Sequence, residues 1–217
     1  MSEIEELRSI VARAQSAAGA RGDVEKWERE EEAQARRDDL RLLEAWGVPR
    51  RIRESLSALR DTRALEAVRR WNDGRQEQAW CIVLSADKGV GKSTAAGWLL
   101  SQMTGGLKAH PSVTRCWWPA SELAAADVYG EGFQELSAKR QLVIDDLGVE
   151  YADSKGAFAS KLDRLLDARY REYRTTVITT NLAAKAFADR YGERVYDRLC
   201  EGGTWVGIAG ASMRRSA

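Results

Sequence analysis

The chain has 217 residues, enough for one substantial domain with an accessory segment, and its formal net charge is only +1. This near-neutral balance excludes a strong overall field of the kind that attracts nucleic acids, so any contact with DNA needs a local basic patch. No apolar run approaches the roughly 18 residues that a membrane-spanning helix needs. The three cysteines are too scattered for a zinc site. We therefore expect a cytoplasmic protein that contacts no membrane and binds no zinc.

The first part of the chain predicts an α-helical region. Residues 1 to 45 are highly charged and nearly free of Gly and Pro, and their apolar positions recur at helical spacing. Gly47-Val48-Pro49 ends this stretch, and residues 50–71 favour further helix with an excess of arginine. We place a domain boundary between residues 75 and 76. A charged helical region of this kind is either a solvated arm or a docking arm for a partner, and its residues favour neither.

From Trp80 onward, short apolar runs alternate with stretches long enough to hold helices. The predicted strands are residues 82–84, 113–118, 141–144, 176–180 and 204–208. Such alternation is typical of βαβ units, in which parallel strands form a sheet that helices cover on both faces. We predict an α/β domain over residues 76–217, preceded by the α-helical region.

A glycine-rich turn follows the first predicted strand and leads into a helix. Strand, glycine-rich turn, Gly-Lys-Ser and helix is the arrangement of a phosphate-binding P-loop, in which backbone N–H groups surround anionic oxygens. Lys92 adds a positive charge for the outer phosphates, and the Ser93 hydroxyl is a ligand for Mg²⁺. The chain is thus predicted to bind a nucleoside triphosphate through Gly89, Val90, Gly91, Lys92, Ser93 and Thr94.

One position departs from the P-loop pattern. The residue five places before Gly91 is Ala86 where the pattern has glycine, and alanine does not readily adopt a positive φ. We expect Gly89 to take the unusual torsion instead. A chance match in a helix-capping turn is the alternative, which the flanking strand and helix disfavour.

The third predicted strand ends in two acidic residues, Asp145 and Asp146. An apolar strand followed by two carboxylates is the pattern of a Walker B element. Asp145 is expected to hold Mg²⁺ and Asp146 to polarise the attacking water. Many ATPases have glutamate at the second position, and aspartate is one methylene shorter. Without the P-loop, the same pair would be equally typical of a helix N-cap or a turn.

Polar residues in two later segments complete the candidate site. The fourth predicted strand ends at Asn181, and a polar residue at the tip of a central strand reaches the γ-phosphate or the attacking water, although a turn-forming asparagine is the alternative. Arg194 and Arg198 are four residues apart and share one face of a predicted helix. Such arginines are either a surface pair or fingers that stabilise transition-state charge on the nucleotide of a neighbouring subunit.

In their order along the chain, these segments resemble the AAA+ ATPase core of the DnaC/IstB helicase-loader family. The resemblance covers residues 80–216. It rests on the P-loop, the strand with two aspartates, Thr179-Thr180-Asn181-Leu182, residues 192–199 and Ser212-Met213-Arg214. The ordered set is much more specific than any one of its motifs. Since the chain stops soon after Arg214, the resemblance also implies a truncated lid.

The resemblance assigns roles to several residues. It implies that Asn181 is the sensor-1 residue, that Arg198 with Arg194 beside it forms the arginine finger, and that Arg214 is a sensor-2-like arginine that contacts the nucleotide. It further implies a Mg²⁺-dependent ATPase that binds ATP or ADP, turns over weakly and depends on self-association through the arginine finger.

The resemblance also implies partners. A loader of this family places a hexameric replicative helicase on single-stranded DNA during replication initiation and grips the helicase through its N-terminal region, here residues 1–75. The candidates for phosphate contact are the basic residues Lys155, Lys161, Arg164, Arg169, Arg171 and Arg174. The compactness of the chain suggests a phage or prophage origin.

Two alternatives stay open. The first is a transposition helper ATPase of the same family, which would bind double-stranded DNA and a transposase, although the balanced charge of the chain counts against it. The second is a nucleotide-switched binding module with negligible turnover, which Ala86 and Asp146 keep in view.

Overall fold

The computed structural model describes residues 30, 31, 34, 37–74, 80–102, 114–127, 129–150 and 156–210. Contacts divide the chain into two units, Met1–Leu42 and Leu43–Ala217. In the first unit, residues 37–42 are helical, and Gln34 donates a hydrogen bond to Asp38. The division falls earlier than the boundary that the sequence predicts at residues 75 and 76. A docking role for residues 1–75 stays a prediction.

Five parallel strands form the sheet of the second unit, in the order β2-β3-β4-β1-β5. The strands are β1 (Cys81–Ser85), β2 (Arg115–Pro119), β3 (Gln141–Leu147), β4 (Thr175–Thr180) and β5 (Gly203–Gly207). Each lies within three residues of its predicted position. Because β4 separates β1 from β3, the carboxyl ends of these strands bring the P-loop, the tip of β4 and the two aspartates to one edge, where ligands bind in α/β folds.

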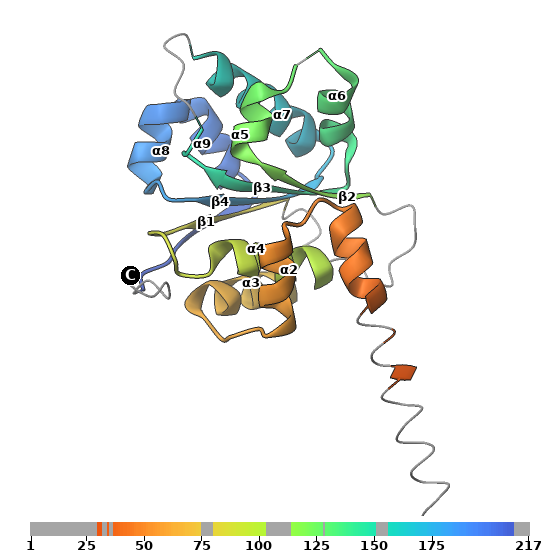
Figure 1. The fold of residues 1–217 in the computed structure, drawn as a ribbon. Coiled ribbons are helices and arrows are strands. Elements are labelled where there is room, and N and C mark those ends of the chain that lie inside the picture. The colour runs from red at the N-terminus through yellow and green to blue at the C-terminus, as the bar shows by residue number, and fades with distance from the viewer. Residues whose placement is uncertain are drawn as a thin grey trace, which may run out of the picture. The chain divides into compact units, whose positions relative to one another are not determined.

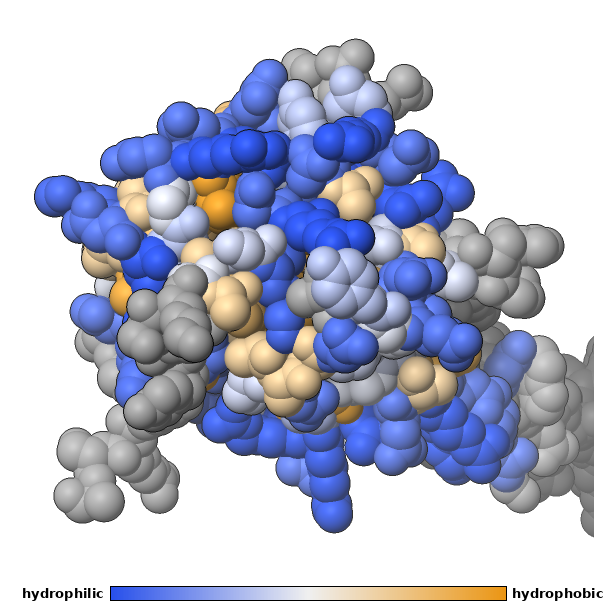
Figure 2. All heavy atoms as spheres, turned by 90° about the horizontal axis from the view of Figure 1, so that it is seen from above, coloured by the Kyte–Doolittle hydropathy of each residue, from blue (hydrophilic) through white to orange (hydrophobic). Residues whose placement is uncertain are grey.

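Helices cover both faces of this sheet (Figure 1). One layer holds α2 (Arg50–Ser57), α3 (Arg63–Asp73) and α4 (Lys92–Gln102). The opposite layer holds α5 (Ala120–Ala125), α6 (Glu131–Ala138), α7 (Ala157–Arg171), α8 (Ala184–Tyr191) and α9 (Glu193–Cys200). The outer surface of this second layer is largely hydrophilic, with small apolar areas (Figure 2).

The strand side chains account for the two layers. In β1, Ile82 and Leu84 belong to the core beneath α2–α4, whereas Cys81 and Val83 belong to the core beneath α5–α9. Such alternation follows from the pleat, which points successive side chains to opposite faces. No helix among the described residues is long and apolar enough to cross a membrane.

The arginine-rich helices α2 and α3 pack on α4. Thr62 caps α3, since its hydroxyl accepts a hydrogen bond from Leu65 N at 3.0 Å. The buried face of α3 is apolar and includes Leu65, Val68 and Trp71. Gly97 of α4 permits close approach of α2, because a Cβ there would lie 2.8 Å from Ile52 Cγ2. The segment 50–73 is therefore part of the same compact unit as the P-loop.

Arg169 of α7 is a structural residue. Its side chain is fully buried, at 0% exposed. The guanidinium donates to Thr176 Oγ1 at 2.8 Å and to the carbonyl oxygens of Leu136, Lys139 and Thr175 at 2.6 to 3.0 Å. Burial lowers the pKa of this group because the charged form loses its hydration. The inclusion of Arg169 among the DNA-contacting candidates is therefore wrong: it joins α6, α7 and β4 in the interior.

Replacement of Arg169 tests this role. Arg169→Ala is expected to lower the free energy of unfolding by about 2–4 kcal/mol, because three carbonyl oxygens and a hydroxyl lose their donors in the interior. Arg171→Ala is the matched control: this exposed arginine pairs only with Asp167 on the same helix, so its removal should change stability by less than about 0.5 kcal/mol. Urea denaturation measures both. Equal effects would contradict the structural role.

Candidate functional site

The P-loop lies at the carboxyl end of β1 and leads into α4. Gly89 and Gly91 have φ values of +88° and +89°, whereas Ala86 has no positive φ. Ala86 N instead donates to Thr180 O at 3.2 Å, which continues the pairing of β1 with β4. The prediction that Gly89 takes the unusual torsion is confirmed. Alanine is tolerated at position 86 because the loop requires no positive φ there.

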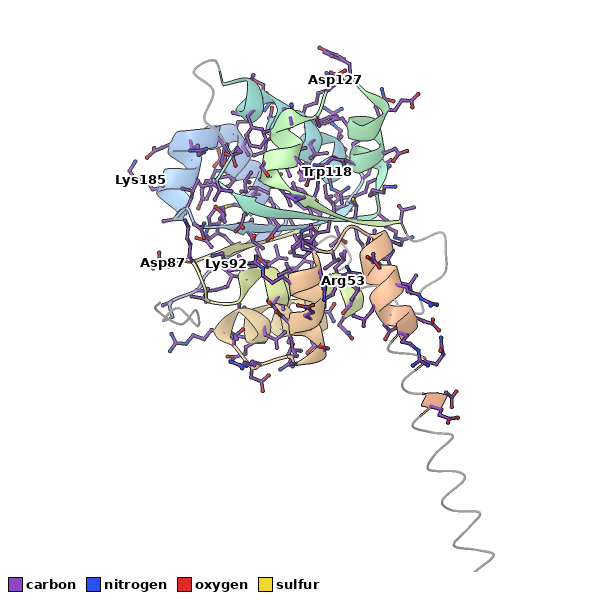
Figure 3. The ribbon with its side chains drawn as sticks, viewed as in Figure 1. Arg53, Asp87, Lys92, Trp118, Asp127 and Lys185 are labelled. Atoms are coloured by element: carbon purple, nitrogen blue, oxygen red, sulfur yellow. The ribbon has the colours of Figure 1, made fainter. Side chains whose placement is uncertain are left out.

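Lys92 joins the P-loop to the tip of β4 (Figure 3). It is buried at the start of α4, and its Nζ donates to Ala86 O at 2.7 Å and Asp87 O at 2.8 Å. The same atom donates to Asn181 Oδ1 at 2.9 Å. The ammonium group of Lys92 is thus held at the floor of the loop, and Asn181 accepts one of its hydrogen bonds. A turn-forming role alone does not explain this contact.

Asp145 and Ser93 provide oxygen ligands suited to Mg²⁺. Asp145 is buried, and burial raises the pKa of its carboxyl, as does the charge of Asp146. Hydrogen bonds from the Thr179 and Ser93 hydroxyls act in the opposite direction. A buried carboxylate beside a second carboxylate and a hydroxyl is a hard-oxygen donor set that a divalent cation would stabilise. These residues therefore fit the predicted metal.

Asp146 has a different environment from its neighbour. Its φ is +58°, a left-handed conformation that few residues other than glycine, asparagine and aspartate adopt. The pairing of β3 with β4 shifts register between Ile144 and Leu147. As a result, Asp145 receives a hydrogen bond from Thr179 at 2.6 Å, while Asp146 lines the cavity above the P-loop. The two carboxylates therefore lie in different environments, Asp145 buried against Thr179 and Asp146 at the cavity.

A cavity of about 410 Å³ unites most of the predicted residues. Its lining includes Gly89, Gly91, Lys92, Ser93, Thr94, Asp146 and Asn181. Val90 does not line it, because its side chain is buried in the hydrophobic core. Arg214 and Lys155 lie outside the described residues.

The sequence analysis missed the contribution of α2 to this cavity. Arg51, Ile52 and Ser55 line it opposite the P-loop, and the Arg51 charge acts to lower the pKa of Asp145. The only signal in the sequence was the excess of arginine before the P-loop. A second cavity of about 420 Å³ shares Arg51, Ser55, Gly91 and Thr94 with the first and extends between α2 and α3. Together the two spaces suit a polyphosphate joined to a larger organic group.

Arg194 and Arg198 lie outside the phosphate cavity, on α9. Both contact Asp163 of α7, which confirms that they share one helix face. Arg198 also pairs with Asp167 at 2.8 Å and has a side chain only 13% exposed. Arg194 is 3.5 Å from Asp163, and its side chain is 73% exposed.

No protein-family model and no curated protein matches the chain. Solved structures do. The DnaC helicase loader aligns with a TM-score of 0.59 and 20% identity, covering 74% of this chain and 100% of that one. A putative primosome component from Streptococcus pyogenes serotype M3 aligns with a TM-score of 0.52 and 18% identity, covering 70% and 80%. The replication initiator DnaA bound to AMPPCP and single-stranded DNA gives 0.53 and 17%, covering 67% and 45%. These likenesses show the fold: the predicted α/β core, with its parallel sheet covered by helices on both faces, is confirmed.

Proposed function

We propose that this chain is a DnaC-type AAA+ ATPase that uses ATP and Mg²⁺ to load a hexameric replicative helicase onto single-stranded DNA. One observation carries the nucleotide part: Lys92 is bonded to Asn181 at the floor of a cavity that Asp146 also lines. A cation, a carboxylate and an amide around one polyphosphate-sized space suit phosphoryl transfer to water. The shared fold with the DnaC helicase loader supports the replication part.

Each residue at the cavity has a distinct role in this proposal. Lys92 and the N–H groups at the start of α4 bind the outer phosphates. Asp146 orients the attacking water and accepts its proton, and Asn181 holds Lys92. Ser93 and Asp145 would hold Mg²⁺, which when bound supplies charge neutralisation on the phosphate oxygens.

Arg198 and Arg194 would act on a neighbouring subunit. Since neither lines the cavity of its own chain, a catalytic role for them requires a second copy. Asp163 of α7 pairs with both arginines, and Arg194 is the more exposed of the two. Hydrolysis by this arrangement depends on self-association.

The contacts that the basic side chains make within the protein reduce the number of residues that could bind single-stranded DNA. Lys161 donates hydrogen bonds to carbonyl oxygens at the end of α5, and Arg174 donates to Ser137 O at 2.7 Å, so both cations already have partners within the protein. Arg164 is different, because its guanidinium lies 5.1 Å from the ring centroid of Tyr129, which is 77% exposed. An exposed tyrosine beside an arginine suits base stacking with phosphate contact. Arg164 and Tyr129 are therefore the best candidates among the described residues.

Two other functions make different predictions. A transposition helper would bind a transposase and double-stranded DNA in place of a helicase and a single strand. A nucleotide-switched module would bind ATP without measurable turnover, with or without single-stranded DNA. The experiments below separate these alternatives.

Lys92→Ala tests the nucleotide site. We expect ATP affinity to fall between about 10- and 100-fold, the effect of losing a charged hydrogen-bond donor. Titration with a fluorescent ATP analogue measures it. Lys185→Ala is the control, since this exposed lysine on α8 pairs with Asp189 of the same helix and lies outside the cavity. Its affinity should stay within about 2-fold of the unmodified chain. Equal weakening by both variants would contradict the proposed site.

Mixing two variants tests the arginine fingers. Arg198→Ala should bind ATP normally yet lose about 1,000-fold or more in hydrolysis. Asp146→Asn should be defective in its own cavity but still offer Arg198 to a neighbour. An equimolar mixture should regain about a quarter of full activity, because half the cavities keep Asp146 and half of their neighbours keep Arg198. A mixture as inactive as its components would refute action in trans. Arg194→Ala is measured in the same way.

Co-elution with a replicative helicase tests the partner. The full chain should form a complex on a sizing column with ATP and Mg²⁺, and a chain lacking residues 1–42 should not. Truncation at residue 42 is preferable to truncation at 75, because α2 lines the nucleotide cavity. If neither form binds the helicase, the loader function is wrong, and a transposase is the next partner to examine.

A further inference from the structure

Glu150 is a buried carboxylate that follows the two aspartates of β3, and the proposed chemistry gives it no role. Its side chain is only 1% exposed. Oε1 accepts hydrogen bonds from Arg190 Nε at 3.1 Å, from Arg190 Nη2 at 2.8 Å and from the Tyr191 hydroxyl. Burial raises the pKa of this carboxyl, but the bonds from Tyr191, Gly148 N and Arg190 outweigh it and hold the pKa below its usual value.

The second carboxylate oxygen of Glu150 holds the segment Asp146–Gly148, which comprises the last two residues of β3 and the first residue after it and is called the turn below. Oε2 accepts a hydrogen bond from Gly148 N at 2.8 Å. Gly148 has a φ of +108°, two residues after Asp146 with its φ of +58°. A peptide segment with two residues at positive φ needs side-chain contacts to keep one conformation. The hydrogen bond from Gly148 N to the Glu150 carboxylate is one such contact.

Three anchors act on three successive residues of this turn. Asp146 N donates to Thr179 Oγ1 at 2.8 Å, and Leu147 O accepts from Thr180 Oγ1 at 2.7 Å. Both of these anchors belong to β4. The third, on Gly148, is the Glu150 carboxylate, which is itself held by α8. The turn is therefore fixed at one end by a strand and at the other by a helix.

The turn also packs against the residues that follow β4. A Cβ on Gly148 would lie 3.0 Å from Leu182 Cγ, so the turn packs closely on the residue after Asn181. Arg190 Nη2 also donates to Glu150 O at 2.8 Å. Glu150 thus connects the turn to α8. Gly148 of the same turn packs on Leu182, the residue after Asn181.

We propose that Glu150 is a positioning residue for Asp146: held chiefly by the three hydrogen bonds from Arg190, it holds Gly148 so that the Asp146 carboxylate faces the phosphate cavity. The proposal rests on the proposed ATPase function, because Asp146 acts on the attacking water. Glu150 is buried and does not line the phosphate cavity. It acts on the rate of hydrolysis through the turn and has little effect on nucleotide binding.

Glu150→Gln separates the contact with Arg190 from the contact with Gly148. A glutamine has one acceptor oxygen and one NH₂ donor. Because the Arg190 guanidinium can only donate, the amide oxygen is kept by Arg190, and the NH₂ group then faces the Gly148 N–H. The variant therefore loses the anchor on Gly148 while its contact with α8 persists. Tyr191→Phe is the matched control, since it removes one donor to the same carboxylate and leaves Gly148 anchored.

The test measures steady-state hydrolysis with single-stranded DNA, ATP affinity and amide hydrogen exchange on the full chain. For Glu150→Gln we expect kcat to fall about 10-fold or more with KM within about 2-fold, and exchange over residues 145–149 to accelerate. For Tyr191→Phe, kcat, KM and exchange in that segment should stay within about 2-fold of the unmodified chain. Light scattering with ATP confirms that both variants assemble alike.

Other outcomes overturn the proposal. Faster exchange in Glu150→Gln with an unchanged kcat would show that the turn does not position Asp146. Unchanged exchange would show that Glu150 does not hold the turn, and equal loss of kcat in both variants would indicate a general effect on folding. An unmodified chain that binds ATP without hydrolysing it would instead overturn the proposed ATPase, and the exchange comparison would still decide whether Glu150 holds the turn.

Discussion

The Thr179 hydroxyl is the contact on which the candidate site depends. It donates to Asp145 Oδ1 at 2.6 Å and accepts from Asp146 N at 2.8 Å, so one side chain of β4 binds two successive residues of β3. This double contact fixes Asp145 in the interior and lets Asp146 turn toward the cavity. Two adjacent carboxylates repel each other, and this contact keeps their side chains in different environments. β4 also ends in Asn181, which holds Lys92.

The phosphate cavity is closed by elements from distant parts of the chain. α2 and α3 precede β1, yet both pack on α4; α2 does so at Gly97 and brings Arg51 and Ser55 to the P-loop. A movement of α2 would therefore change the nucleotide cavity directly. In the opposite layer, Asp163 of α7 pairs with both Arg194 and Arg198 of α9 and so joins the two helices.

Much of the fold could be predicted because its signals are local. Short apolar runs with helical intervals identified all five strands of the sheet, since strands buried on both faces, such as β1, are rich in apolar residues. The P-loop could be read from Gly89, Gly91 and Lys92 because phosphate binding needs those residues at that spacing. Even the displaced glycine torsion at Gly89 followed from the residue types alone. The acidic pair near the end of β3 and Asn181 just after β4 were likewise visible, because they stand at the carboxyl ends of strands in a parallel sheet.

The sequence by itself therefore determined the class of fold, the P-loop and the strand-end residues Asp145, Asp146 and Asn181, since each depends on neighbours within a few residues. Only the tertiary structure decided which charged residues face water. Arg169 and Glu150 resemble surface charges in the sequence, yet both are buried, because carbonyl oxygens of α6 and the side chains of α8 reach them from 30 or more positions away. Arg51 joins the nucleotide cavity for the same reason. Burial of a charge depends on partners brought together by packing, and such partners leave no local pattern in the sequence.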